Sequence, residues 1–275
     1  MQIKIRGTHN LRDLGGLRNS SGETVREHLF IRGSQLSRIS GRGAGKISKL
    51  VRPATVVDLR TDAEHTEKPD RSIPGAAYVH VPLFSEETAG LSRAKGQTLR
   101  SIALGGHSRE DLLAAIPNLE DVYPVMATSR EAIRGLREAL DIIIGNALNE
   151  RATLYHCTAG KDRTGVVSFL LLHMLDVDYD TIVGEYMLSN AGAWADIIKY
   201  CPLVFIATGS IRCARKLKEV LKARKRYLDS FISAASRDFG SIDGFISEAL
   251  GISPETIDSL KKAALVRTQE PGLRA

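Results

Sequence analysis

Cys157, Arg163 and Thr164 have the types and the spacing of a phosphate-handling site: the arginine follows the cysteine by six positions and the threonine comes next. A short apolar run precedes Cys157, and a strongly apolar run over 166–175 follows Thr164. This pattern predicts a strand, a tight loop and a buried helix. The first N–H groups of a helix have no partner within the helix and carry partial positive charge, so an anion should bind beside the cysteine.

Each residue of this loop suits the same chemistry. A cysteine among backbone N–H groups and near a cation should have a pKa below the ~8.5 of a free thiol, so we expect Cys157 to be a thiolate at neutral pH. Arg163 offers a planar fork that grips two phosphate oxygens. Gly160 permits positive φ, and Thr164 can steady the sulfur as it leaves. A nucleophile inside such a cage predicts a covalent cysteinyl-phosphate intermediate.

The string from His156 to Gly165 resembles the His-Cys-x5-Arg-Ser/Thr signature of the cysteine-dependent tyrosine phosphatase superfamily, and in particular its bacterial atypical lipid-like branch. The resemblance covers most of the chain, because four further stretches are similar: residues 10–16, 32–37, 56–60 and 245–265. It implies an enzyme that hydrolyses phosphate monoesters, namely phosphotyrosine, in some members phosphoserine and phosphothreonine, and phosphoinositides. It also implies no cofactor and no metal, and we expect bound phosphate or sulfate in a crystal.

Cleavage of a phosphate ester needs a general acid for the leaving oxygen. No aspartate follows the strand at 76–81, although the superfamily usually takes its acid from a separate loop. The lipid-like branch is thought to use an aspartate inside the loop, so we predict that Asp162 is the acid. Asp58 at the end of a strand is the second candidate, and its alternative role is a salt bridge that holds the site. More distant candidates are Glu86, Glu87 and Asp121.

The remaining loop residues are predicted to bind the substrate. His156 is expected to orient the loop or the thiolate, and Lys161 either faces solvent or contacts an additional phosphate such as one on an inositol ring. The predicted catalytic residues are Cys157, Arg163, Asp162 and Asp58. The predicted substrate-binding residues are His156, Thr158, Ala159, Gly160, Lys161 and Thr164.

Composition indicates a soluble globular chain, with 43% hydrophobic and 25% charged residues. The longest apolar run, 166–175, is far shorter than the ~20 residues of a membrane-spanning helix. The N-terminus lacks the apolar segment of a secretory signal. Three cysteines without metal-ligand spacing indicate a reducing compartment, so we expect a cytoplasmic protein in which Cys201 and Cys213 are inert or, less simply, protect an oxidised Cys157.

The net charge of +6 is concentrated in one segment. The segment 212–226 contains eight basic residues and one acidic residue, Glu219, with apolar residues between them. The pattern predicts a basic amphipathic helix. Such a helix is either a solvated face packed on the domain, or a surface attracted to an anionic membrane or a polyanionic substrate. Nucleic acid is not expected, because aromatic residues are few and no binding motif is present.

The coarse pattern of elements predicts an α/β fold, a single tyrosine-phosphatase-like domain over 1–275 with a central mixed sheet flanked by helices. Residues 83–128 lose clean periodicity and are predicted to be a helical lid insertion. Thr128 with Glu131 predicts a capping box at the start of the next helix. The expected strands are 2–5, 28–32, 54–59, 76–81 and 154–156. The expected helices are 39–51, 128–148, 166–175, 178–190, 211–235, 242–250 and one from 253.

Two other classes of protein remain as alternatives. A catalytically silent phosphate- or phosphoinositide-binding module would keep the loop but not turn over a substrate. A rhodanese-like sulfurtransferase or a thiol-based arsenate reductase would also place a cysteine in an anion-binding loop. Neither of these two enzymes accounts for His156, Arg163 and Thr164 together.

Overall fold

A computed structural model of the chain describes residues 1–84, 113 and 116–267. Its centre is a five-stranded sheet in the order β1-β3-β6-β4-β5. The strands are β1 (Arg12–Asp13), β3 (Phe30–Ser34), β6 (Ala152–Cys157), β4 (Pro53–Asp58) and β5 (Ala77–His80). β1 pairs antiparallel to β3, and the other neighbours pair in parallel, so the predicted mixed α/β architecture is confirmed.

The register of the parallel strands brings the chemically interesting residues to one edge of the sheet. Cys157 at the end of β6 is level with Ser34, and His156 is level with Asp58 on β4. Asp58 is in turn level with His80 on β5. Because parallel strands all end at the same edge, the loops after these strands meet there, which is where α/β folds usually bind ligands.

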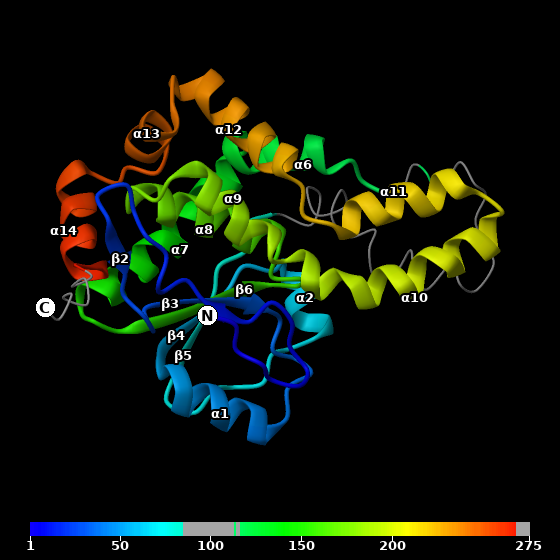
Figure 1. Cartoon of the computed structure of the whole chain (residues 1–275), viewed down its shortest axis with the longest axis horizontal. Helices are drawn as coiled ribbons and strands as arrows, with labels where there is room; N and C mark the ends of the chain where they lie inside the picture. The colour runs from blue at the N-terminus through cyan, green and yellow to red at the C-terminus, as the bar shows by residue number, and fades with distance from the viewer. Residues whose placement is uncertain (85–112, 114–115, 268–275) are drawn as a thin grey trace, which may run out of the picture.

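Helices cover both faces of the sheet (Figure 1). On one face lies α1 (Gly41–Val51), whose Ile47 and Val51 are buried against Ile3 and Ile5 of the N-terminal segment. On the other face lie α7 (Arg130–Leu148) and α8 (Asp162–Met174) within the larger core. Eleven of the 13 residues of α8 are buried, which agrees with its predicted central position.

The remaining elements complete the second face and the C-terminus. Helix α6 (Leu119–Thr128) lies against α12 (Lys225–Phe239), and α14 (Pro254–Ala264) lies against α7. A two-stranded sheet joins β2 (Glu23–Val25) to β7 (Leu265–Arg267). The short elements are α2 (Asp62–Glu67), α9 (Tyr179–Met187), α13 (Ile242–Gly244) and the π-helical turn η1 (Phe245–Ala249).

Two helices form an arm that extends away from the rest of the described chain (Figure 1). They are α10 (Asn190–Thr208) and α11 (Ile211–Leu221), which run alongside each other. The sequence patterns did not predict α10, and they joined α11 and α12 into one helix. The chain instead breaks at Lys222, whose extended backbone ends α11 before α12 begins.

Other boundaries also differ from the predictions. The helix α7 is capped by Ser129, whose hydroxyl accepts from the Ala132 N–H, because Thr128 still belongs to α6. Residues 2–5 contribute only an isolated bridge to Arg12. Most of the predicted lid at 83–128 lies outside the described residues. Its last ten residues form α6, whose inner face is buried in the core.

Candidate active site

The loop between β6 and α8 starts at Cys157, which is buried, and ends at Asp162, the first residue of α8. β6 is hydrogen-bonded on both sides, by β3 and β4, so the cysteine sits on the most constrained strand of the sheet. The loop therefore joins a fixed cysteine to the N-terminus of a buried helix, and this strand, loop and helix follow the order that the sequence predicts.

The loop backbone is held from the outside through its carbonyl oxygens. Asn10 Nδ2 donates to the Ala159 carbonyl at 2.8 Å, and Arg32 Nη2 donates to the Gly160 carbonyl at 3.0 Å. Gly160 has φ +64°, and a Cβ there would lie 2.4 Å from the backbone of Gly33. Because these carbonyls point outward, the N–H groups of the following residues are available on the other side, where an anion would bind.

A buried ion-pair network supports Arg32 from behind. Glu185 of α9 accepts from Arg12 Nε at 2.5 Å and from Arg32 Nη1 at 2.6 Å. Burial and the neighbouring Arg32 lower the pKa of Arg12 to about 10, and Glu185 opposes that shift, so the Arg12 guanidinium stays charged at neutral pH. The network connects the N-terminal segment, β3 and α9 to the loop and keeps the Arg32 side chain under Gly160.

The environment of Cys157 favours the thiolate. Burial opposes ionisation, yet the charge of Arg163 and hydrogen bonding from Thr164 hold the pKa of Cys157 below that of an ordinary thiol. Both the hydroxyl and the backbone N–H of Thr164 act on the sulfur, although the buried hydroxyl is not well aligned for a hydrogen bond to any described residue. The nearby charge of Asp162 acts in the opposite direction and raises the pKa.

Arg163 forms an ion pair with Glu64, a residue that the sequence analysis did not identify. Its Nη1 and Nη2 donate to the two carboxylate oxygens of Glu64 on α2, at 2.6 and 2.9 Å. Thr158 Oγ1 also donates to Glu64, at 2.5 Å. Burial alone would raise the pKa of Glu64, but Arg163 and Thr158 lower it to about 2. Glu64 therefore fixes the plane of the guanidinium fork beside the loop.

Asp162 is partly exposed and is oriented by a buried tyrosine. The Tyr123 hydroxyl of α6 donates to Asp162 Oδ1 at 3.0 Å and lies 2.6 Å from the Tyr186 hydroxyl. Burial and the Asp162 charge raise the pKa of Tyr123 well above the ordinary value, so the hydroxyl stays protonated and can donate. The structure thus holds the predicted acid at the helix N-terminus, next to Arg163.

Lys161 does not contact the anion site, contrary to the expectation of a phosphate contact or a solvent-facing charge. Its side chain is buried, and Nζ donates to the carbonyls of Val220 at 2.6 Å and Lys222 at 3.2 Å. The same atom lies 3.3 Å from Asp162 Oδ1. The last carbonyls of a helix have no partner within it, so the lysine caps the C-terminus of α11.

Asp58 is fully buried at the end of β4, and its carboxylate is occupied by Arg60. Arg60 donates to Oδ1 from Nε at 2.8 Å and to Oδ2 from Nη2 at 2.7 Å, and the Tyr78 hydroxyl donates to Oδ2. Burial opposes ionisation, but these bonds and the charge of His156 hold the pKa of Asp58 far below its usual range. A carboxylate that stays ionised cannot supply a proton, so the geometry favours the salt-bridged role over proton transfer.

His156 is buried between two carboxylates. Nε2 lies 2.9 Å from Asp70 Oδ2 and Nδ1 lies 3.8 Å from Asp58 Oδ1. Neither nitrogen has the alignment of a hydrogen bond, so we describe both contacts as ionic. Burial opposes protonation, but the two carboxylates raise the pKa of His156. The side chain anchors the end of β6 and does not act as a direct ligand for a substrate.

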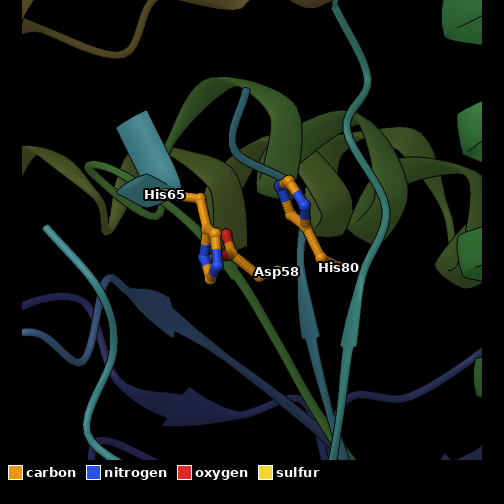
Figure 2. A group of neighbouring side chains, drawn as sticks. All are labelled: Asp58, His65 and His80. Atoms are coloured by element: carbon orange, nitrogen blue, oxygen red, sulfur yellow. The ribbon is translucent and has the colours of Figure 1, made fainter. Parts of the chain in front are cut away.

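Two groups of described side chains have the composition of a metal site: Asp58 with His65 and His80, and Asp58 with Asp70 and His156. Figure 2 shows the first group at the ends of β4 and β5. The rings of His65 and His80 stack with centroids 4.6 Å apart instead of converging on one point. Because the Asp58 and Asp70 carboxylates are already paired with Arg60, these residues do not fit a cation.

Four residues of the site come from distant segments and escaped the sequence analysis. They are Glu64, Asp70, Tyr123 and Glu185. Only Glu64 had a readable local signal, since Thr61 and Glu64 form a capping box at the start of α2. That pattern predicts a helix start but not an ion pair with a residue about a hundred positions later in the chain.

Comparison with known proteins identifies the chain. A model of the tyrosine phosphatase family matches residues 3–266. The chain is 27% identical to the triple specificity protein phosphatase PtpB of Mycobacterium tuberculosis over 285 aligned positions, covering 95% of this chain and 98% of that protein. It is 26% identical to a tyrosine-protein phosphatase of Nostoc commune over 58% of this chain and 48% of that one. The chain therefore belongs to the tyrosine phosphatase family.

Proposed function

We propose that this tyrosine phosphatase hydrolyses phosphate monoesters through a cysteinyl-phosphate intermediate. One observation carries the proposal: the buried Cys157, with its lowered pKa, lies in the same loop as Arg163 and the N-terminus of α8. The loop N–H groups and the guanidinium bind the non-bridging phosphate oxygens, where negative charge must be balanced during the transfer.

The first step transfers the phosphoryl group to sulfur. The Cys157 thiolate attacks phosphorus, a sulfur–phosphorus bond forms, and the bond to the leaving oxygen breaks. Protonated Asp162 gives its proton to that oxygen, so the product leaves as an alcohol or a phenol. The Tyr123 hydrogen bond to Asp162 Oδ1 supports this role, because it fixes the carboxyl group at the helix N-terminus.

The second step releases inorganic phosphate. The Asp162 carboxylate, having lost its proton, takes one from a water molecule that attacks phosphorus. The sulfur–phosphorus bond breaks, and the electron pair returns to Cys157 as a thiolate. The Thr164 hydroxyl beside the sulfur stabilises the charge that reappears there.

The substrates that we propose are phosphotyrosine in proteins and the phosphate groups of phosphoinositides. The triple specificity of the Mycobacterium tuberculosis relative supports more than one class of phosphate ester. The rival role is a silent phosphate-binding module, and the presence of Cys157, Arg163 and a candidate acid together favours the enzyme.

The test measures turnover of a phosphotyrosine peptide and a panel of phosphoinositides in the presence of a chelator. Cys157→Ser should abolish turnover, and Asp162→Asn should lower kcat by roughly 10²–10⁴-fold. Matched controls are Cys201→Ser on the arm and Asp180→Asn in the exposed first turn of α9, which should keep wild-type turnover. Normal turnover in Asp162→Asn would reject the acid, and an inert wild type that still binds phosphate would replace the enzyme with the binding module.

A further inference from the structure

The outer face of α10 carries large apolar side chains that are exposed. Trp194, Ile198, Phe205 and Ile206 are 54%, 69%, 48% and 77% exposed. Their spacing of four, seven and one residues places all of them on one side of a helix with 3.6 residues per turn. The adjacent edge of α10, including Ile197 and Val204, is buried. We call these four side chains the apolar stripe.

The neighbouring helix α11 presents a basic face. Arg215 and Lys218 follow Ile211 at intervals of four and three residues, so they share one side, while Cys213, Leu217 and Val220 are buried on the other; Lys222 follows directly after the helix. Within α10 the charged residues are only Asp196 and Lys199. The arm thus separates apolar and cationic surface between its two helices.

The apolar stripe and the basic face lie on the same side of the arm. Lys222 Nζ, at the end of α11, is 5.2 Å from the centre of the Trp194 ring near the start of α10. Further along, the charge of Lys218 opposes the effect of burial on the pKa of Cys201 in α10, so these side chains are also close. An apolar row bordered by cations, with a tryptophan among them, matches the interface between water and an anionic bilayer.

The arm is suited to lying on a membrane and not to crossing it. Among the described residues, one helical run, Tyr179–Thr208, is long and apolar enough to span a bilayer, and 17% of its most apolar window is buried. However, Tyr186 of that run is in the core, and Asn190 is hydrogen-bonded to the Ala223 backbone. The return helix α11 would also have to carry its cationic residues through the hydrocarbon, which is unfavourable.

We propose that the α10–α11 arm is a docking surface for anionic phospholipid membranes, with the apolar stripe inserted between the headgroups and the basic face of α11 on their negative charge. This inference goes beyond the phosphatase activity and does not depend on it, because vesicles without any phosphate monoester should bind.

The experiment uses the full chain and vesicles of phosphatidylcholine with or without phosphatidylserine. Trp194 is the only tryptophan in the sequence, so its fluorescence reports directly on the stripe. Anionic vesicles should shift its emission to shorter wavelength and sediment the protein, and added salt should weaken binding. The affinity for neutral vesicles should be lower than that for anionic vesicles by at least roughly tenfold.

Variants separate the two components of the surface. Ile198→Asp with Ile206→Asp should lower vesicle affinity by at least roughly tenfold, whereas Leu50→Asp, at a position on α1 that is 56% exposed, should not. Arg215→Gln with Lys218→Gln should weaken binding to anionic vesicles, and Arg42→Gln with Lys46→Gln on α1 is the matched control. Turnover of a soluble phosphate ester should be unchanged in all of them, which verifies folding.

Three results would overturn the proposal. They are an absence of vesicle binding with unchanged Trp194 emission, equal binding by the Ile198→Asp/Ile206→Asp variant, and equal binding to neutral and anionic vesicles. A dimer in solution that this double variant converts to a monomer would instead assign the apolar stripe to contact with a second copy of the chain.

Discussion

Replacing Glu64 by glutamine removes the charge that holds Arg163 while keeping the size of the side chain. In the folded protein the pKa of Glu64 is about 2, against 4.5 without the fold, even though burial opposes ionisation. Each pKa unit corresponds to ~1.36 kcal/mol, so the ionised carboxylate contributes roughly 3 kcal/mol to the free energy of unfolding. We expect Glu64→Gln to lose about that amount at neutral pH, or roughly 6–12 °C in Tm.

The stabilisation by Glu64 should depend on pH in a direction that follows from its lowered pKa. A carboxylate whose pKa is depressed by folding stabilises the protein above its unfolded pKa, and this contribution disappears as the pH falls through the folded value. The difference between wild type and Glu64→Gln should therefore be constant from pH 7 to about pH 5 and fall to about 1.4 kcal/mol near pH 3.

The assay is urea unfolding followed by circular dichroism from pH 7 down to pH 3, with Glu67→Gln as control. Glu67 lies on the same helix but is exposed and, among the described residues, pairs with Lys68, so its replacement should cost less than about 0.5 kcal/mol. A loss below about 1 kcal/mol for Glu64→Gln at pH 7, or a loss that does not change down to pH 3, would refute the reasoning.

Three further predictions follow from the loop contacts. Tyr123→Phe should lower kcat roughly tenfold with little change in KM, because Asp162 loses its orienting hydrogen bond. A roughly tenfold rise in KM at constant kcat would argue against this role. Thr164→Val should raise the pKa of Cys157, so iodoacetamide should alkylate the variant more slowly than wild type below pH ~8.5, and unchanged pH profiles would contradict it. Lys161→Met should lower the free energy of unfolding by roughly 1–3 kcal/mol and speed proteolysis within α11, because the Val220 and Lys222 carbonyls lose their donor. An unchanged rate of proteolysis within α11 would exclude the capping role.

The catalytic loop was predictable because its chemistry is local in sequence. Cys157, Arg163 and the apolar run of α8 lie within one short segment, and their spacing alone sets a strand, a loop and a helix. The residues that orient the loop were not predictable in this way. Glu64, Tyr123 and Glu185 reach it only through tertiary packing, and an acidic or aromatic residue in isolation carries no information on its partner.

Helix α10 escaped prediction for a physical reason. Sequence periodicity identifies a helix when one side is apolar and the other polar. In α10 the buried edge and the exposed stripe are both apolar, so the 3.6-residue period is hidden, and Pro202 inside the helix weakens the pattern further. Lys161 was misjudged because lysine usually reaches solvent, whereas here the end of α11 supplies carbonyl partners for a buried ammonium group.

The bond between Lys161 and α11 limits how the arm can be altered by evolution or by protein engineering. The arm resembles an appendage in outline, and a shortened chain lacking residues 190–222 would remove most of its exposed apolar surface. It would also remove the Val220 and Lys222 carbonyls that bind Lys161 Nζ, so the contact with Asp162 Oδ1 would no longer be balanced by contacts to α11. Trimming the arm therefore requires a second change, the replacement of Lys161 by a neutral side chain, for the catalytic loop to keep its shape.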